Sequence, residues 1–328
     1  MPVHSIFPNA LNPARLSPTE LNPAVLNPDT LKQIQPSHRD QALAWCAWLE
    51  TGNILYFPQT PVPVPTADLD FLLGQFQTGS RLHKNISYRP ARDKLSGVEA
   101  KTATSETRDQ LRAVMRRYSA SVAGYLTQFL APYEQRWLLD YASCRPIEEE
   151  GRDLPLHRRN DLLHTDAFPT RPTRGHRILR FFHNIHPSRT RDWVVGGPFS
   201  RIVADFAPAK VPLPQPDGTW TRLGKRLAGA TGLAMLLPQW KRTPYDEFMR
   251  RMHNAMKEDE HFQRSCAREY FQFAPGSSWV VYTDMVAHAV LAGQFALEQT
   301  FLVDPAVMVM PESAPLAVLE KMSGARLV

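Results

Sequence analysis

The residues best suited to chemistry are a histidine and a carboxylate one residue apart, His164 and Asp166, in the segment 162–169. An extended backbone directs side chains two positions apart to the same side, so both groups can enter one cavity. Two histidines and one carboxylate on one face of a metal are typical of non-haem Fe(II) oxygenases. The pair therefore predicts two of the three ligands of such a site.

The His-x-Asp pattern is weak evidence by itself, because His38 and Asp40 form it a second time. That second pair falls at the predicted start of a helix over 37–49, where side chains two residues apart do not face each other. Asp40 is also suited to the first turn of that helix. Sequence context therefore favours His164 and Asp166 as the functional pair.

His288 is the best candidate for the third ligand, because it closely follows a strand-like run over 278–283 in the last third of the chain. Alternatives in the region of the first pair are His176, His183 and His186. A single histidine is more often a structural residue than a ligand. The order and spacing of the first pair and His288 favour metal binding.

A dioxygenase that uses 2-oxoglutarate also needs a cation for the distal carboxylate of that cosubstrate. No lysine or arginine occurs between Arg268 and Lys321, so no cation closely follows His288. A guanidinium binds a carboxylate through two parallel hydrogen bonds. We therefore expect Arg180 to hold the distal carboxylate, with Asn184, on the same side of the predicted strand, as a hydrogen-bonding helper.

The elements that must position these residues change in type along the chain. A long helix is predicted over 107–129, because its apolar residues recur at three- and four-residue spacing. Aromatic and β-branched runs then predict strands, and a further helix interrupts them at 243–261. The predicted strands cover 54–57, 177–185, 193–199, 270–273, 278–283 and 300–303. Helices followed by many strands predict an α+β fold.

Composition excludes several other classes of protein. The 328 residues are 43% hydrophobic, which is too apolar for a disordered chain. Three cysteines without a Cys-x-x-Cys pair exclude a disulfide scaffold and a thiolate zinc site. Neither a glycine-rich phosphate loop nor a hydrolase nucleophile elbow occurs. The net charge of +6 indicates an anionic partner only where the charge is clustered.

The domain prediction has two parts. Residues 1–36 are rich in proline and are expected to form an irregular arm, and 37–328 are expected to form one domain. Within it, 37–150 is predicted as the helical part and 151–310 as the strand-rich core. Without a signal peptide or an apolar run of about 18 residues, a cytoplasmic location is expected.

Several segments together resemble one known family. The most specific is Leu-Leu-His-Thr-Asp-Ala-Phe-Pro-Thr-Arg-Pro-Thr at 162–173, and the others lie at 84–88, 177–185, 193–199, 283–289 and 293–300. These segments resemble the 3-deoxy-D-manno-oct-2-ulosonic acid (Kdo) 3-hydroxylases. The resemblance extends from about 41 to 303 and leaves the proline-rich arm outside.

The resemblance implies a double-stranded β-helix, or jelly-roll (cupin-like), core with flanking helices. It implies Fe(II) as the metal on His164, Asp166 and His288, with 2-oxoglutarate and O2 as cosubstrates. The implied reaction hydroxylates carbon 3 of Kdo in Kdo-lipid A, giving D-glycero-D-talo-oct-2-ulosonic acid in the inner core of lipopolysaccharide.

The implied partner is an anionic glycolipid, which carries a carboxylate on Kdo and phosphates on lipid A. Peripheral contact with the cytoplasmic face of the inner membrane is expected, and no nucleic-acid partner is expected because no nucleic-acid module is present. Basic and polar residues near the iron-binding block are the candidate substrate contacts, namely Lys84, Asn85, Tyr88, Arg171 and Arg174.

Three other functions remain open at this point. A related 2-oxoglutarate hydroxylase could act on a protein side chain or a small metabolite through the same ligands. The same three ligands could bind zinc in a hydrolase. A non-catalytic protein could use the basic residues to bind an anionic lipid.

Overall fold

The computed structural model describes residues 37–75, 85–98, 103–207, 209–218, 221, 224, 227 and 242–328. The predicted arm over 1–36 and the candidate residue Lys84 lie outside these ranges. In the described residues, no helix has the length and apolar character needed to cross a membrane.

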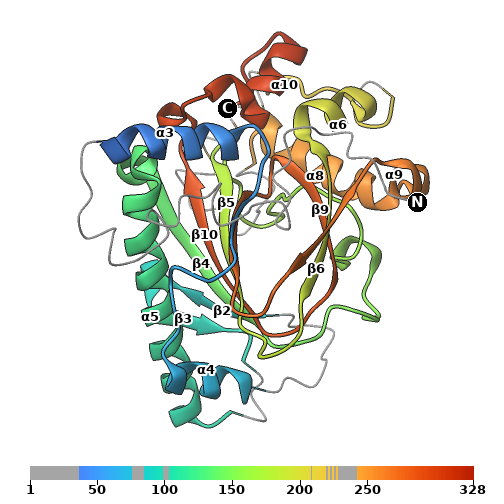
Figure 1. The fold of residues 1–328 in the computed structure, drawn as a ribbon. Coiled ribbons are helices and arrows are strands. Elements are labelled where there is room, and N and C mark those ends of the chain that lie inside the picture. The colour runs from blue at the N-terminus through green and yellow to red at the C-terminus, as the bar shows by residue number, and fades with distance from the viewer. Residues whose placement is uncertain are drawn as a thin grey trace.

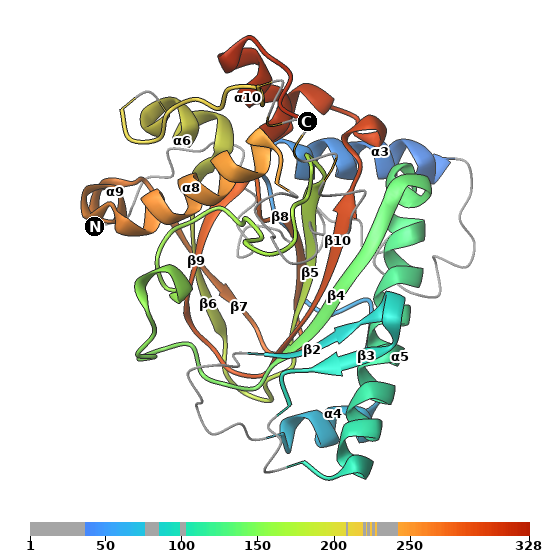
Figure 2. The ribbon, with the colours of Figure 1, turned by 180° about the vertical axis from the view of Figure 1, so that it is seen from behind.

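Two antiparallel sheets face each other across the core (Figures 1 and 2). The seven-stranded sheet has the order β1-β8-β5-β10-β4-β2-β3, and the three-stranded sheet has the order β7-β6-β9. The larger sheet consists of β1 (Leu55–Phe57), β2 (Ile86–Arg89), β3 (Lys94–Ser96), β4 (Trp137–Arg145), β5 (Arg177–Asn184), β8 (Ser278–Tyr282) and β10 (Ala296–Val303). The smaller sheet consists of β6 (Arg191–Pro198), β7 (Glu269–Phe273) and β9 (Val286–Ala292).

An aromatic cluster fills part of the space between the two sheets. Phe273 and Trp279 stack with their ring centroids 3.8 Å apart, and the ring of Trp193 meets that of Trp279 edge-on at 5.5 Å. Phe182 stacks on Trp279 from β5. All four side chains are buried, so aromatic packing excludes water from this region.

The long helix α5 (Ser105–Phe129) lies along the outer side of the larger sheet (Figure 1). Its buried residues follow the predicted helical spacing and include Leu111, Met115, Val122 and Phe129. The other helices are α3 (Ser37–Glu50), α4 (Thr66–Leu73), α6 (Phe199–Phe206), α8 (Pro244–Glu258), α9 (Glu260–Ser265) and α10 (Pro315–Ser323).

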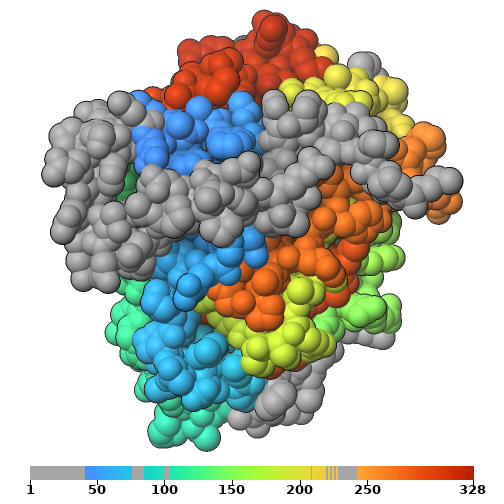
Figure 3. All heavy atoms as spheres, in the orientation of Figure 1, coloured from blue at the N-terminus to red at the C-terminus, as the bar shows by residue number. Residues whose placement is uncertain are grey.

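The C-terminal segment is tied to the end of α3. The carboxylate of Glu50 accepts hydrogen bonds from the backbone N–H groups of Val309 and Met310 and from the hydroxyl of Tyr133. The space-filling view shows the C-terminal region directly above α3 (Figure 3). These charge-assisted bonds satisfy a fully buried carboxylate.

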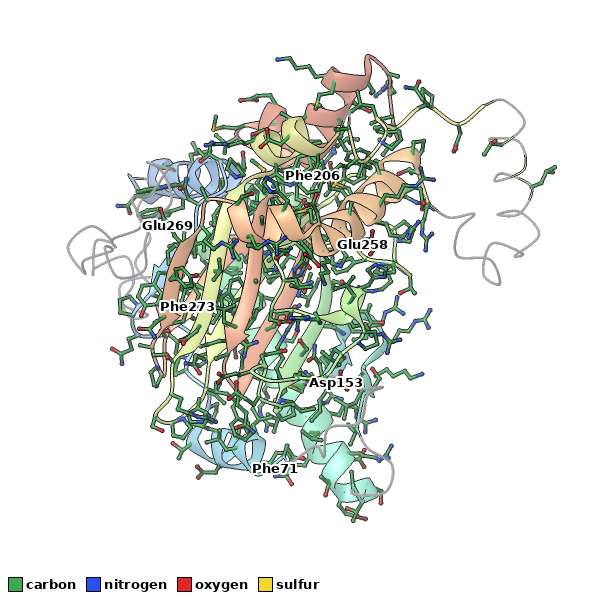
Figure 4. All side chains as sticks on the ribbon, turned by 90° about the vertical axis from the view of Figure 1, so that its right-hand side faces the viewer. Phe71, Asp153, Phe206, Glu258, Glu269 and Phe273 are labelled. Atoms are coloured by element: carbon green, nitrogen blue, oxygen red, sulfur yellow. The ribbon has the colours of Figure 1, made fainter. Side chains whose placement is uncertain are left out.

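The helix predicted over 243–261 is in fact two helices. α8 begins with a capping box, in which Thr243 and Asp246 exchange hydrogen bonds between side chain and backbone. It ends at Glu258, which is labelled in Figure 4. In that view α8 lies across the strands. Asp259 then caps α9 by accepting the backbone N–H of Phe262. Asp259 therefore breaks the continuous helix that the apolar spacing predicted.

The boundary predicted at residue 150 does not separate helices from strands. The part predicted as helical contributes β1, β2, β3 and β4 to the larger sheet, and of these only β1 falls on a predicted strand, at 54–57. The strand β4 was not predicted, because only part of it is buried and its residues do not alternate regularly between apolar and polar. Pairing with β10 on one side and β2 on the other stabilises it instead.

Candidate active site

The segment that carries the first two candidate ligands is held against the smaller sheet by backbone hydrogen bonds. His164 and His288 exchange N–H to O=C hydrogen bonds of 3.1 and 2.9 Å, which form an isolated antiparallel bridge. The N–H of Asp166 donates to the carbonyl of Thr283, 2.8 Å away. These bonds fix the extended backbone that directs His164 and Asp166 the same way.

The structure brings His164, Asp166 and His288 together, as the sequence predicted. One potential ligand atom from each lies within 4.8 Å of the others. His164 Nε2 is 3.7 Å from Asp166 Oδ1, and the two imidazole rings are 4.8 Å apart between centroids. Both histidines are buried, and the carboxylate side chain is 15% exposed. The three side chains form a compact group with one partly accessible member.

Hydrogen bonds orient the two imidazole rings. Nδ1 of His164 is 2.7 Å from the carbonyl oxygen of Leu162, and Nδ1 of His288 is 3.0 Å from that of Val286. A carbonyl only accepts, so each Nδ1 carries the proton and each Nε2 keeps its lone pair for a metal. Trp193 also stacks on the ring of His288, with centroids 5.3 Å apart.

The protonation states suit metal binding as well. Burial lowers the pKa of His164 well below its usual value and also lowers the pKa of His288, so both rings are neutral near pH 7. For Asp166, burial opposes ionisation, but the positive charge of Arg180 is the largest of the contributions that outweigh it, and the pKa stays below its usual range. The neutral imidazoles and ionised carboxylate are the forms that bind a divalent cation.

This donor set fits Fe(II). Two neutral imidazoles and one carboxylate on one side of a metal leave other coordination positions open, as in non-haem iron oxygenases. The same set also fits a catalytic zinc. Among the described residues, no other group of histidine, cysteine, aspartate and glutamate reaches this proximity, and the alternatives His176, His183 and His186 stay outside it.

Arg180 contacts the triad directly. Its Nη2 is 2.9 Å from Asp166 Oδ2, and its Nη1 is 2.5 Å from Glu298 Oε1. Its Nε is buried and has no hydrogen-bond partner among the described residues. Arg180 is therefore next to the candidate metal-binding carboxylate, Asp166, and its Nε is still available as a donor.

A chain of buried ion pairs extends from Arg180 away from the triad. Glu298 also pairs with Arg145, which is 3.8 Å from Glu149. Glu149 is 3.6 Å from Arg191, whose side chain is fully buried. Arg152 also pairs with Glu149. Four arginines therefore face three carboxylates, namely Arg145, Arg152, Arg180 and Arg191 against Glu149, Asp166 and Glu298. The region therefore carries an excess positive charge before any metal binds.

Arg191 is the most unusual member of this chain. Its Nη1 donates to the carbonyl of Gly293, but Nε and Nη2 have no hydrogen-bond partner within the described part of the protein. Burial lowers its pKa to about 10. A buried arginine with two unsatisfied donors is costly in isolation and is suited to an anionic ligand.

Sequence reasoning missed Arg145, Glu149, Arg191 and Glu298. A charged residue within a strand rich in apolar residues, as Glu298 is in β10, could have indicated them. Such a residue is buried only when it has a partner. Glu298 in β10 pairs with arginines of β4 and β5, and Glu149, in the segment after β4, pairs with Arg191 of β6. These pairs join segments distant in the sequence, so the sequence did not indicate which charges pair.

Asn184 is not brought to the triad. Its side-chain N–H groups donate to the carbonyls of Arg189 and Phe273, and its Oδ1 accepts the N–H of His186. The fully buried amide therefore holds the turn after β5. It is four residues from Arg180, about 13 Å along a strand, and both of its amide N–H groups already have partners. Its predicted contact with the cosubstrate stays a prediction.

The predicted substrate contacts are scattered. Asn85 lines a cavity beside the triad, whereas Lys84 lies outside the described residues. Tyr88 is buried and donates its hydroxyl to Asp93. Arg171 pairs with Asp140 and lies over the ring of Tyr141. Arg174 is exposed at a positive φ of 53°, and its N–H donates to Asp246. Among the described members of this group, only Asn85 lines that cavity.

The cavity beside the triad has a volume of about 530 Å³. The β2–β3 hairpin, the segment around η3 (Leu156–Arg158) and α8 contribute its walls. Its lining residues are Asn85, Ser87, Ser96, Gly97, His157, Arg158, Asn160, His164, Asp166, Ala167, Pro169, His253 and Lys257. Polar and basic groups predominate, which suits a hydrophilic, anionic substrate.

The sequence model of the 3-deoxy-D-manno-oct-2-ulosonic acid (Kdo) hydroxylase family matches residues 32–326. No curated protein matches the chain. Structures of the Kdo hydroxylase KdoO, a non-haem Fe(II) α-ketoglutarate-dependent dioxygenase, resemble it over most of its length. The KdoO complex with α-ketoglutarate and Fe(III) is 34% identical, with a TM-score of 0.74 over 90% of this chain and 93% of KdoO.

The cobalt(II) complex of KdoO is 35% identical, with a TM-score of 0.75 over the same shares of the two chains. The complex with succinate and Fe(III) is 34% identical, with a TM-score of 0.74 and the same coverage. These similarities and the two antiparallel sheets confirm the expected α+β, cupin-like fold.

Proposed function

Because the chain belongs to the Kdo hydroxylase family, we propose that it is an Fe(II)/2-oxoglutarate-dependent dioxygenase that hydroxylates carbon 3 of Kdo in Kdo-lipid A. The observation that carries this proposal is the convergence of His164, Asp166 and His288 at a cavity large enough for a sugar. The alternative functions, a non-catalytic lipid-binding protein and a zinc hydrolase, would not explain why the chain matches the Kdo hydroxylase family.

In this proposal, His164 and His288 bind Fe(II) through Nε2, and Asp166 binds it through its carboxylate. Fe(II) held by these residues would supply the activation of O2 for a reaction in which one oxygen atom enters the substrate and the other enters succinate, as 2-oxoglutarate loses carbon dioxide. The chain's own contribution is to orient these ligands. The carbonyls of Leu162 and Val286 hold the imidazole rings, and Trp193 restricts movement of His288.

The buried arginines supply the counter-charge for 2-oxoglutarate. Arg180 remains our proposed cosubstrate ligand, because its guanidinium lies beside Asp166 and retains a free Nε. The two carboxyl carbons of an extended five-carbon diacid are about 5 Å apart, from four C–C bonds of about 1.5 Å. A cosubstrate bound at the triad would therefore be long enough to extend past Arg180 towards the ion-pair chain.

Arg191 is a second candidate for the distal carboxylate. It lies at the far end of that chain and has two donors without partners. A carboxylate there would satisfy both donors and would offset the excess positive charge. We propose that Arg180 interacts with the end of the cosubstrate near the metal and that Arg191 interacts with the distal end.

The lipid part of the substrate and the site of action belong to the same proposal. Kdo-lipid A displays its sugars at a membrane surface, so the enzyme would act in the cytoplasm with peripheral contact at the inner membrane. The basic wall of the cavity, with Lys257 and Arg158, supports an anionic glycolipid. Flotation of the protein with vesicles that contain Kdo-lipid A, against vesicles without it, tests this contact.

The function is tested by mass spectrometry of Kdo-lipid A after incubation with the protein, Fe(II) and 2-oxoglutarate. The expected product contains one added oxygen atom, and equimolar succinate accompanies it. His164→Ala is expected to abolish both products. His261→Ala, a change at an exposed histidine on α9, is the matched control and should leave both unchanged. Hydroxylation by the His164→Ala protein would contradict the assignment of the ligands.

A further inference from the structure

One side chain at the cavity beside the triad has a role that the reaction so far leaves open. Lys257 lies on α8 and lines the same cavity as His164 and Asp166. It is only 4% exposed, which is rare for a lysine. Its Nζ donates to the carbonyls of Arg159, at 2.7 Å, and His157, at 3.2 Å.

These two bonds leave Lys257 incompletely satisfied. An ammonium group has three N–H donors, and two of them are used. Within the ranges that the structure describes, no carboxylate lies at ion-pair distance from Nζ, although other buried cations such as Arg177 and Arg145 have carboxylate partners. Burial lowers the pKa of Lys257 to about 8, although the charges of Asp166 and Asp161 oppose this shift from beyond ion-pair distance. A buried ammonium without a direct ion pair is costly, and the cavity is where an anion can reach it.

The neighbouring side chain does not compete for an anion. His253 is one turn before Lys257 on the same face of α8. Its Nδ1 is 2.8 Å from the carbonyl oxygen of Thr165, so it donates to that carbonyl. Burial lowers the pKa of His253 to about 4, which keeps the ring neutral at pH 7. The ammonium of Lys257 is therefore the cationic group of this part of α8.

The chemistry of the substrate indicates which anion lies near the metal. In a 3-deoxy-2-ulosonic acid, carbon 1 is the carboxylate and carbon 3 is the methylene that is oxidised. Only carbon 2 separates them, so the two carbons are about 2.5 Å apart, from two C–C bonds of about 1.5 Å. When carbon 3 faces the triad, the carboxylate must lie in the same cavity. The phosphates of lipid A are farther away along the molecule.

We propose that Lys257 binds the carboxylate of the Kdo unit and thereby places carbon 3 beside the triad. This inference rests on the proposed function and adds the residue that recognises the sugar acid. The two backbone carbonyls fix the position of Nζ, so its third N–H is directed by the protein before the substrate arrives. A neutral sugar of similar shape would leave that ammonium unpaired and would bind poorly.

The test compares two substrates with two proteins. We would assay the wild type and Lys257→Gln with two substrates. One is Kdo-lipid A, and the other is its derivative in which the Kdo carboxylate is reduced to an alcohol. The wild type should lose about 10- to 100-fold in kcat/KM on the reduced substrate, as expected for a hydrogen bond to a charged group. Lys257→Gln should show that loss with Kdo-lipid A itself and should distinguish the two substrates by less than about threefold.

Two further variants control for charge and folding. Lys257→Arg keeps the positive charge and should restore part of the discrimination. Lys210→Met removes a half-exposed lysine that pairs with Asp259 outside the cavity, and should behave as the wild type. Full discrimination by a folded Lys257→Gln protein would overturn the proposal. Another outcome would also overturn the proposal. If Lys257→Gln no longer distinguishes Kdo-lipid A from its dephosphorylated form but still distinguishes it from the carboxyl-reduced form, Lys257 binds a phosphate instead.

A binding measurement separates this proposal from the proposed function. Titration calorimetry of the full-length protein with free Kdo and with its carboxyl-reduced form requires no turnover. The wild type should bind Kdo about 10- to 100-fold more tightly than the reduced sugar, and Lys257→Gln should lose this preference. If the wild type adds no oxygen to Kdo-lipid A, the proposed function fails. Equal affinities of the wild type for the two sugars would overturn the role of Lys257.

Discussion

Replacing Arg191 by leucine distinguishes between two roles for this arginine, binding of the cosubstrate and stabilisation of the fold. In the absence of a ligand, Arg191 has one hydrogen bond, to a backbone carbonyl, and one long ion pair of 3.6 Å with Glu149. Glu149 would keep its contacts with Arg145, Arg152 and Asn160. Removing the guanidinium therefore leaves no unpaired carboxylate, and we expect the free energy of unfolding to change by less than about 1 kcal/mol.

The same change should strongly weaken the binding of 2-oxoglutarate. A hydrogen bond to a charged group contributes about 1.5–3 kcal/mol, which corresponds to about a 10- to 150-fold rise in the dissociation constant. Anaerobic titration calorimetry with Fe(II)-loaded protein measures this constant directly. Denaturant unfolding of the same preparation measures stability.

Arg177→Leu is the matched control, because Arg177 is also a fully buried arginine in a strand. Its guanidinium donates to Asp284 at 2.8 and 3.4 Å and lies over the ring of Tyr282. Its removal strands a buried carboxylate, so stability should fall by about 3–5 kcal/mol with little change in affinity for 2-oxoglutarate. The reasoning is refuted if Arg191→Leu loses stability as Arg177→Leu does and binds 2-oxoglutarate normally.

Three further predictions concern the surroundings of the site and one surface carboxylate. Gly293→Ala should destabilise the protein and weaken the binding of 2-oxoglutarate. Gly293 has φ +122°, and an added Cβ would lie 2.8 Å from the side chain of Arg191. An unchanged denaturant midpoint together with an unchanged affinity for the cosubstrate would contradict this prediction. Trp193→Ala should lower the free energy of unfolding by about 3–5 kcal/mol and weaken metal binding by freeing His288, measured by denaturation and by metal titration. Hydrogen bonds from Arg250, together with smaller contributions, lower the pKa of Glu247 to about 2. The ionised carboxylate therefore stabilises the fold above pH 4.5, and this contribution should be lost as the pH falls towards 2. Over that interval the free energy of unfolding of the wild type should fall by about 1 kcal/mol more than that of Glu247→Gln, and equal losses would contradict the prediction.

The sequence predicted the local part of the site well. His164 and Asp166 are two residues apart in an extended segment, and their convergence follows from backbone geometry alone. The third ligand, His288, depends on a bridge between segments distant in the sequence. Its spacing and the family resemblance indicated it, but the backbone hydrogen bonds that form the bridge were visible only in the structure.

Charges in strands were harder to interpret. Arg180 lies beside Asp166, and its predicted role in holding the distal carboxylate of 2-oxoglutarate stays a prediction. Asn184, on the same side of the same strand, holds a turn through three backbone contacts. The odd or even spacing of two residues in a strand determines whether their side chains lie on the same face of the sheet. It does not determine which of them is close to a ligand bound at one point along the strand. Buried ion pairs such as Arg145 with Glu298 join different strands, so their pairing depends on strand order, which the sequence alone did not provide.

The basic residues near the iron-binding block show the same limit. Arg171 and Arg174 were expected to contact the substrate because they are close in sequence to the ligands, yet neither lines the cavity. Lys257 does line it, although it is about ninety positions away from Asp166 in the sequence. Its position on α8, directly after the buried Met256, placed it at the edge of an apolar stripe, where the helical spacing alone gave no reason to single it out.

The central claim is that this chain inserts one atom of molecular oxygen into the Kdo unit of Kdo-lipid A. The most direct measurement is the mass of Kdo-lipid A after reaction with Fe(II), 2-oxoglutarate and O2 enriched in the heavy oxygen isotope. We predict a product that carries one heavy oxygen atom on its Kdo unit. An unchanged mass, or an added oxygen that comes from water, would contradict the account.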